Sequence, residues 1–232
     1  MEPKKLICFS LWGTHEFYNY GALENALIAK DIYPGWICRY YYLENGCDVR
    51  IIEQLRKLDN VELIEMKGID TNNNMFWRFD PAFSEKDVIM ISRDTDSRLN
   101  QREKVAVDKW LESDKDFHIM RDHPHHTAQI MGGMWGSRNN ILFPLKEQYE
   151  SFVKNGNRGA DQDFLKQTVY PHVQNNVMIH ASHYRIETNC MDMPKIQIEG
   201  NFVGAYVRNA SQTFKILGEP VRLLGVRYPY QA

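Results

Sequence analysis

A short apolar run, Val88–Ser92, is the sequence feature that most restricts the fold. A strand that is apolar on both faces fits the middle of a parallel sheet, where helices cover both sides. The polar stretch Arg93-Asp-Thr-Asp96 follows the run at once. We therefore expect a central, buried strand whose carboxyl end carries acidic side chains.

Segments typical of strands and helices alternate along the first half of the chain, and no Pro/Gly/Ser-rich linker or internal repeat interrupts them. This alternation predicts an α/β fold: a Rossmann-like, mainly parallel central sheet flanked by helices. The expected strands are Leu6–Leu11, Ile37–Tyr42, Val61–Met66, Val88–Ser92 and Phe117–Met120. The expected helices are Gly21–Lys30, a helix capped by Asp48 that ends at Leu58, and Gln101–Ser113, capped by Asn100.

The second half of the chain, from about Pro124, is less regular. Loops rich in His, Gly and Trp surround two expected helices, near Lys146–Lys154 and Asp161–Val169, and strand-like pieces lie at Val177–His180 and Phe202–Val207. We interpret this half as loops and short elements that complete a site, and not as an independent domain.

Charge and cysteine usage restrict the class of protein. Lys and Arg number 28 against 30 Asp and Glu, a net charge of -2, which argues against a dedicated binder of nucleic acid or of an anionic membrane. The four cysteines form no C-x-x-C pair, so reduced thiols in a cytoplasmic protein are expected. The apolar run that ends near Trp12 is shorter than the roughly 18 residues of a membrane-spanning helix, so no membrane span is expected.

Acidic D-x-D pairs occur three times, and their context separates them. Asp114 and Asp116 lie among other charges between a helix and a strand, and the pair at Asp161 opens a helix, where carboxylates favour the helix dipole. Asp94 and Asp96 alone follow a buried strand. Ligands of open parallel sheets bind beyond the carboxyl ends of the strands, and hard cations such as Mg²⁺ or Mn²⁺ prefer oxygen ligands. A metal site and a simple capping turn both fit this position.

An ordered series of motifs goes beyond this general pattern. It resembles GT-A-type nucleotide-sugar glycosyltransferases of the kind found in bacterial surface-polysaccharide loci and in large viruses. The resemblance covers more than half of the chain. The motifs are Phe76-Trp-Arg-Phe79, Ser92-Arg-Asp-Thr-Asp-Ser-Arg-Leu99, Phe117-His-Ile-Met-Arg-Asp-His-Pro124, Gly132-Gly-Met-Trp-Gly136, Asp161-Gln-Asp-Phe-Leu165, Ile179-His-Ala-Ser182 and Phe202-Val-Gly204.

The resemblance implies a GT-A-like fold and transfer of a sugar, hexosyl or pentosyl, from a UDP- or GDP-linked donor to a glycan or other hydroxyl acceptor. It implies that Asp94 and Asp96 hold Mn²⁺ or Mg²⁺ against the donor diphosphate, where the cation stabilises developing charge. His180 matches the late histidine that is often a third ligand. The family often has Asp after this His, whereas this chain has Ala181, and His183 is the alternative.

The resemblance also implies sites for the rest of the donor. The first strand-to-helix loop matches the nucleotide-binding edge, where aromatic side chains stack on a base; ordinary aromatic packing is the alternative. Arginines would contact the diphosphate or form internal salt bridges, and glycines would let the backbone approach the sugar or form a tight turn. The candidate donor-binding residues, apart from Asp94, are Ser10, Trp12, Tyr18, Arg78, Arg93, Gly133 and Trp135, with Phe17 and Tyr20 as further aromatics. The histidines 118, 123, 125 and 126 would line the sugar pocket; a zinc site is the alternative, although paired cysteines and helical H-x-x-x-H spacing are absent from the sequence.

Asp161 and Asp163 resemble the acidic segment at the junction of donor and acceptor. If the reaction inverts the sugar, one of them is expected to deprotonate the acceptor hydroxyl; helix capping is the alternative for Asp161. The chain is expected to be one GT-A-like catalytic domain, 1–232, with a nucleotide-binding part at 1–123 and a sugar and acceptor part at 124–232.

Other functions compete with sugar transfer. A haloacid-dehalogenase-type phosphatase also uses D-x-D after a strand, usually the first one, with Asp as nucleophile. A sugar-nucleotide pyrophosphorylase would need a Gly-rich phosphate loop near the N-terminus, and none is found there. A non-catalytic module that only binds nucleotide sugars fits the departure at Ala181.

Overall fold

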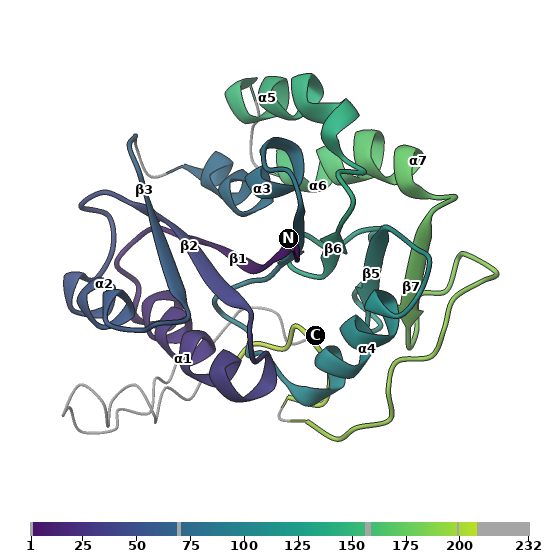
Figure 1. Cartoon of the computed structure of the whole chain (residues 1–232), viewed down its shortest axis with the longest axis horizontal. Coiled ribbons are helices and arrows are strands. Elements are labelled where there is room, and N and C mark those ends of the chain that lie inside the picture. The colour runs from purple at the N-terminus through teal and green to yellow at the C-terminus, as the bar shows by residue number, and fades with distance from the viewer. Residues whose placement is uncertain (1, 69–70, 156–158, 199, 208–232) are drawn as a thin grey trace.

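The computed structural model describes residues 2–68, 71–155, 159–198 and 200–207. A seven-stranded sheet, in the order β3-β2-β1-β4-β6-β5-β7, runs through the whole molecule (Figure 1). The strands are β1 (Lys4–Leu11), β2 (Ile37–Leu43), β3 (Val61–Met66), β4 (Val88–Ser92), β5 (Phe117–Arg121), β6 (Trp135–Ser137) and β7 (Val177–Ala181). All pairs are parallel except those of β6, which runs antiparallel to both β4 and β5. The predicted mainly parallel α/β sheet is confirmed.

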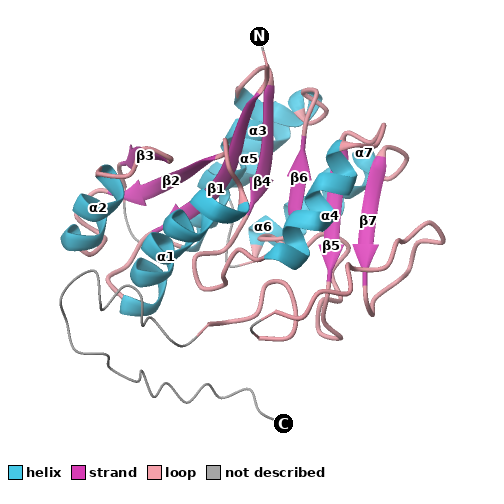
Figure 2. Ribbon diagram, turned by 60° about the horizontal axis from the view of Figure 1, so that its bottom comes forward, coloured by secondary structure: helices cyan, strands magenta, loops and turns pink. Residues whose placement is uncertain are grey.

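Helices cover both faces of the sheet (Figures 1 and 2). One face carries α1 (Glu16–Ile32), α2 (Val49–Arg56) and α4 (Gln101–Leu111). The other carries η1 (Asn72–Phe79), α3 (Asp80–Ser84), η2 (Phe143–Leu145), α5 (Lys146–Asn155), α6 (Ala160–Phe164), the π-helix η3 (Leu165–Val169) and α7 (Tyr170–Val173). None of the described helices is long and apolar enough to cross a membrane.

Two hydrophobic cores lie on opposite faces of the sheet, and β1 contributes alternate residues to both. Leu6 and Cys8 pack with η1, α5 and α6, whereas Ile7 and Phe9 pack with α1 and α2. Period-two alternation explains this division, since successive side chains of a strand point to opposite faces. The arrangement accounts for strands that are apolar throughout.

The helix starts follow the expected capping chemistry. The Asp48 carboxylate accepts from the Arg50 N–H at 2.9 Å, and the Asn100 amide oxygen accepts from the Glu103 N–H at 3.0 Å. The second half of a capping box is absent at α4, because the Glu103 carboxylate accepts instead from Arg93, at 3.0 Å. This buried bond ties α4 to the end of β4.

Proline explains the π-helix between α6 and α7. Pro171 has no N–H to donate, and its ring would clash with the carbonyl four residues earlier in an α-helix. Just before Pro171 the helical turn contains one extra residue, so that the Tyr170 N–H donates to Leu165 O, five residues earlier. π-bulges of this kind are commonly short.

One predicted element is wrong. Residues 202–207 form turns and extended loop, not a strand. Asn201 and Gly204 have φ of 67° and 85°, in the left-handed region that a strand does not use. The segment folds back toward β4, where the Val207 N–H donates to Asp96 O at 3.1 Å.

Candidate active site

Two adjoining cavities open at the carboxyl edge of the sheet, where the loop after β4 carries the acidic pair. The larger has a volume of about 480 Å³, and Ser10, Trp12 and Tyr18 contribute to its walls. The smaller, of about 220 Å³, is lined by His126, Gln162, Gly132, Gly133 and Gly204, among others. Residues shared by both walls are Met75, Arg78, Asp94, Asp96 and Tyr206. The carboxylates therefore lie where the two cavities meet.

The negative charge of Asp94 influences the ionisation of Asp96. Asp94 forms an ion pair with Arg78, whose side chain is almost fully buried. Burial, and next the negative charge of Asp94, raise the pKa of Asp96 to about 7, although Arg78 opposes the rise. A bound cation would remove this repulsion, so the pair is suited to a positive ligand.

The donor set suits a hard divalent cation that is completed by substrate oxygens. Mg²⁺ is usually bound by one or two carboxylates together with substrate phosphates and waters, and Mn²⁺ accepts the same ligands. In the described ranges no group of three or more His, Cys, Asp and Glu side chains is placed to hold a metal by itself. Asp94 and Asp96 fit a metal shared with a ligand, and they do not form a closed protein site.

The structure places His180 away from these carboxylates, contrary to its expected place as third ligand. It lies on β7, which β6 and β5 separate from β4, so three strand spacings put it about 14 Å from the β4 axis. Its Nδ1 is 2.9 Å from Nε2 of His118, and both rings are fully buried. Burial lowers the pKa of His180 to about 4. His183, the alternative, is exposed in the loop that follows β7.

Two predicted donor-binding residues also lie beneath the site. Arg93 is buried, and its Nε donates to Glu103. Trp135 is fully buried and stacks on Phe117, with ring centroids 5.3 Å apart. Neither side chain forms part of the two cavity walls, so both support the site through packing.

The loop after β1 supplies the predicted residues of the larger cavity. Ser10 Oγ accepts from the Arg78 N–H at 3.1 Å and so fixes η1 against β1. Tyr18 is 37% exposed, whereas Phe17 and Tyr20 are buried. Of the aromatic candidates, Trp12 and Tyr18 line the larger cavity.

Glycines allow the chain to pass close to the acidic pair. A Cβ on Gly133 would lie 2.0 Å from Asp94 Oδ2, so only glycine fits beside this carboxylate. A Cβ on Gly132 would lie 2.8 Å from Arg78 Nη2 and 3.4 Å from Asp161 Oδ2. Gly132 O also accepts from Ser92 Oγ at 2.7 Å. Gly133 therefore lies beside Asp94 through its backbone.

The α6 segment approaches the smaller cavity. Asp161 is buried beside Gly132, and Asp163, one residue beyond Gln162, is exposed. With its oxygen turned toward Gly132, the Gln162 amide accepts from the Gly132 N–H at 2.9 Å and donates to Ile130 O at 3.2 Å. Gln162, which the motif analysis did not single out, therefore holds the glycine segment.

The residues that hold the acidic loop also escaped prediction. Asn25 donates to Ser97 O at 2.8 Å and accepts from the Leu99 N–H at 2.9 Å. Glu24 pairs with Arg98 at 2.6 Å. These α1 side chains face a loop far away in sequence, and no local pattern marks such a contact.

Comparisons with known proteins establish the fold. No protein-family model and no curated protein matches the sequence. TarS of S. aureus, residues 1–349, is 12% identical, with a TM-score of 0.53 over 76% of this chain and 57% of that one. A 4-diphosphocytidyl-2C-methyl-D-erythritol synthase from Anaerococcus prevotii is 13% identical, with a TM-score of 0.51 over 82% and 92%. A glycosyltransferase involved in glycosylation of the major capsid of PBCV-1 is 14% identical, with a TM-score of 0.47 over 77% and 82%.

The predicted GT-A-like fold and the resemblance to GT-A-type proteins are confirmed at the level of architecture. Identities of 12–13% carry the argument no further than the fold. One fold also hosts different reactions, so the reaction has to be argued from the site.

Proposed function

We propose that this chain is a metal-dependent glycosyltransferase that moves a sugar from a nucleoside-diphosphate-sugar to a glycan or other hydroxyl acceptor. The observation that carries the proposal is the position of Asp94 and Asp96 at the junction of the two cavities. A diphosphate is the part of such a donor that joins a nucleoside to a sugar. Carboxylates that share a cation with it are needed at that junction.

The sizes of the cavities support this assignment. The larger, about 480 Å³, lies within the roughly 300–1,000 Å³ of small-molecule sites, and it would take the nucleoside of a UDP- or GDP-linked donor against Trp12 and Tyr18. The smaller, about 220 Å³, would take the sugar beside Gly132 and Gly133. In this proposal residues 1–123 bind mainly the nucleotide, and residues 124–232 the sugar and acceptor.

A Mn²⁺ or Mg²⁺ ion on Asp94 and Asp96 would supply charge stabilisation to the leaving diphosphate. Arg78, buried and anchored by Ser10, adds a fixed positive charge at the same place. If the reaction inverts the sugar, Asp161 or Asp163 would take the proton of the acceptor hydroxyl, and Asp161 is favoured by its place beside Gly132. The binding of acceptor and the choice of hexosyl or pentosyl group belong to this proposal.

Calorimetry with a panel of UDP- and GDP-sugars, with and without Mn²⁺, tests the proposal. The wild-type chain should bind one donor only when metal is present, and Asp96→Ala should abolish this binding while remaining folded. Asp114→Ala is the matched control, because Asp114 belongs to another D-x-D pair and its side chain is 82% exposed. Donor binding that needs no metal and survives in Asp96→Ala would contradict the proposal.

Product analysis separates the remaining alternatives. Release of nucleoside diphosphate with transfer of sugar to an added acceptor is expected for the enzyme. Donor binding without turnover over a broad acceptor panel would favour a binding module. An acid-stable phosphoenzyme would favour the phosphatase chemistry.

A further inference from the structure

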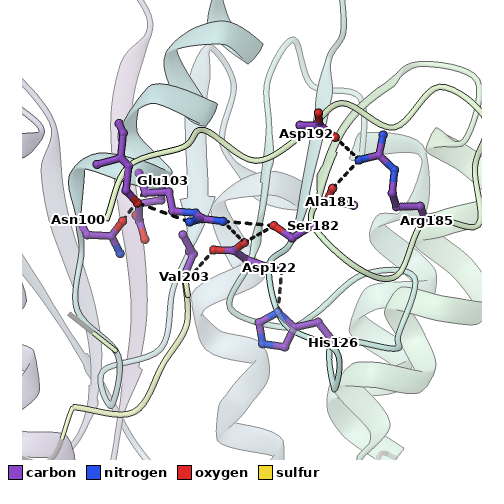
Figure 3. Close-up of polar contacts among 11 residues, drawn as sticks. Asn100, Glu103, Asp122, His126, Ala181, Ser182, Arg185, Asp192 and Val203 are labelled. Carbon is purple, nitrogen blue, oxygen red and sulfur yellow. Dashed lines mark hydrogen bonds and ion pairs between the residues drawn. The ribbon is translucent and has the colours of Figure 1, made fainter. Parts of the chain in front are cut away.

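A tight turn after β5 brings one histidine back beneath the strand end. Residues 123–126 form the turn, in which the His126 N–H donates to His123 O at 2.9 Å. Pro124 occupies the second position, which favours proline because its φ is already fixed. The turn places the His126 ring so that the Asp122 N–H donates to Nδ1 at 3.1 Å (Figure 3).

This hydrogen bond determines where the proton of the ring lies. A backbone N–H can only donate, so Nδ1 of His126 must present its lone pair. A neutral imidazole with an unprotonated Nδ1 carries its proton on Nε2. Burial, and secondarily the neighbouring His123, lower the pKa of His126 to about 4, so the neutral form prevails near pH 7.

The orientation of the ring is held from several sides. Phe202 packs against it with ring centroids 5.6 Å apart, and Gly204 passes so closely that a Cβ there would lie 3.7 Å from Cε1. The Asp122 carboxylate is itself held in place: it accepts from Arg102 at 2.6 Å. It also accepts from the Val203 N–H at 2.9 Å (Figure 3). The ring is therefore preorganised before any ligand arrives.

The proton on Nε2 has no acceptor within the protein as far as the structure describes it, since the bond from Asp122 is the one hydrogen bond of the His126 side chain. His126 is 8% exposed and lines the smaller cavity. The Gln162 side-chain amide, which also lines this cavity, is hydrogen-bonded to Ile130 and Gly132. Three methionines, Met75, Met131 and Met134, also line this cavity and offer no donor. The donors Arg78, which is paired with Asp94, and Tyr206 belong to the wall that is shared with the larger cavity.

We propose that His126 is a specificity-determining residue that donates a hydrogen bond from Nε2 to an oxygen of the transferred sugar. The inference rests on the proposed function and adds to it the residue that distinguishes a nucleotide sugar from the nucleoside diphosphate alone. A site built to bond a sugar oxygen discriminates strongly against a ligand that lacks it.

Two substitutions of His126 separate the role of the Nε2 hydrogen-bond donor from that of the hydrogen bond between Asp122 and Nδ1. His126→Asn keeps an oxygen near the Nδ1 position to accept from Asp122, but it removes the Nε2 donor. His126→Gln keeps an N–H donor near the Nε2 position and loses the bond to Asp122. His125→Asn is the control, because His125 is exposed in the same turn and lies outside the cavity wall.

Calorimetry with Mn²⁺ should compare the nucleotide sugar with the corresponding nucleoside diphosphate. In His126→Asn we expect affinity for the nucleotide sugar to fall about five- to tenfold, the size of one lost hydrogen bond, with affinity for the nucleoside diphosphate unchanged. His126→Gln should recover most of the loss, and His125→Asn should match the wild type. Unchanged sugar-nucleotide affinity in His126→Asn, or an equal loss for the nucleoside diphosphate, would overturn the inference.

A second measurement needs no ligand. Long-range ¹H–¹⁵N correlation spectra at pH 7, assigned with His126→Asn, should show the proton of this ring on Nε2. A proton on Nδ1 would overturn the inference while leaving the proposed function intact. Failure of the wild-type chain to bind any nucleotide sugar would instead overturn the proposed function, and this inference with it.

Discussion

Arg78 and Asp94 form an ion pair whose two members differ sharply in their contact with water. The Arg78 side chain is 3% exposed and that of Asp94 is 38% exposed. The guanidinium also has a buried Nε without a partner in the described structure. The arginine therefore depends on the carboxylate for compensation of its charge, whereas the carboxylate can be solvated without the arginine.

This asymmetry predicts unequal effects on stability. Asp94→Asn should lower the free energy of unfolding by about 2 kcal/mol, below the usual range for a broken buried pair because Asp94 is partly solvated. At pH 6, Arg78→Met should lower the free energy of unfolding clearly less than Asp94→Asn does, because protonation of Asp96 limits repulsion between the two carboxylates. The double variant, Asp94→Asn with Arg78→Met, should be more stable than the sum of the two single losses implies. Urea unfolding measures all three. Equal losses in both single variants would show that the exposure difference has no energetic consequence.

The raised pKa of Asp96 predicts pH-dependent metal binding. A metal binds the ionised carboxylate, so protons compete with it below the pKa of about 7. Affinity for Mn²⁺ should be nearly constant above pH 7.5 and should fall about tenfold for each pH unit below 7. Titration calorimetry in buffers of different ionisation enthalpy should also detect proton release at pH 6. A flat profile would show that Asp96 is not a ligand.

Gly133 should be irreplaceable for metal binding. In Gly133→Ala the new methyl group would lie 2.0 Å from Asp94 Oδ2 and must displace this carboxylate, so we expect at least about a tenfold loss of Mn²⁺ affinity. Gly35→Ala is the control: its φ of 80° costs roughly 1 kcal/mol of stability, yet a Cβ there meets nothing within 4 Å. The control should lose thermal stability and keep its metal affinity. A normal Mn²⁺ titration of Gly133→Ala would refute the proposed geometry.

The buried pair His118 and His180 predicts acid sensitivity. The pKa of each is lowered, mainly by burial, so the unfolded chain takes up protons before the folded one. Stability should be fully present above about pH 6.5 and should fall toward pH 4, by about 1.4 kcal/mol per pH unit for each histidine. His180→Leu should remove the contribution of one histidine, about 1.4 kcal/mol per pH unit, from this pH dependence of the free energy of unfolding. It should leave Mn²⁺ affinity unchanged. Loss of metal affinity in that variant would restore His180 as a ligand.

Elements with a strong local signal could be predicted from the sequence. Val61–Met66 and Val88–Ser92 have the expected bounds. Val88–Ser92 is an apolar run between polar segments, which leaves little choice of structure. The strand β6 could not be found in this way, since its three residues are too few to show a period. Residues 202–207 have a strand-like composition, which led to the wrong prediction of a strand. The left-handed backbone conformations of Asn201 and Gly204 make this segment a loop instead.

The candidate site was predictable to the extent that it follows from one strand end. Asp94 and Asp96 face the cavities because any residue just past β4 lies at that edge. Nothing near His180 in the sequence indicates that two strands stand between β4 and β7, and this strand order places the histidine elsewhere. His126 and Gln162 also line the smaller cavity. His126 packs against Phe202 and Gln162 bonds to Ile130 and Gly132, and these contacts join segments far apart in the sequence.

The antiparallel strand β6 sets a scale for what the smaller cavity can hold. It keeps β4 and β5 two strand spacings apart, about 9.6 Å, and the acidic loop and the histidine turn grow from the ends of those two strands. Backbone hydrogen bonding therefore sets the distance between β4 and β5, and side-chain replacements do not change it. Engineering this cavity for larger ligands should therefore succeed by replacing Met131 or Met134 on its wall with smaller residues, and not by attempts to separate the strands.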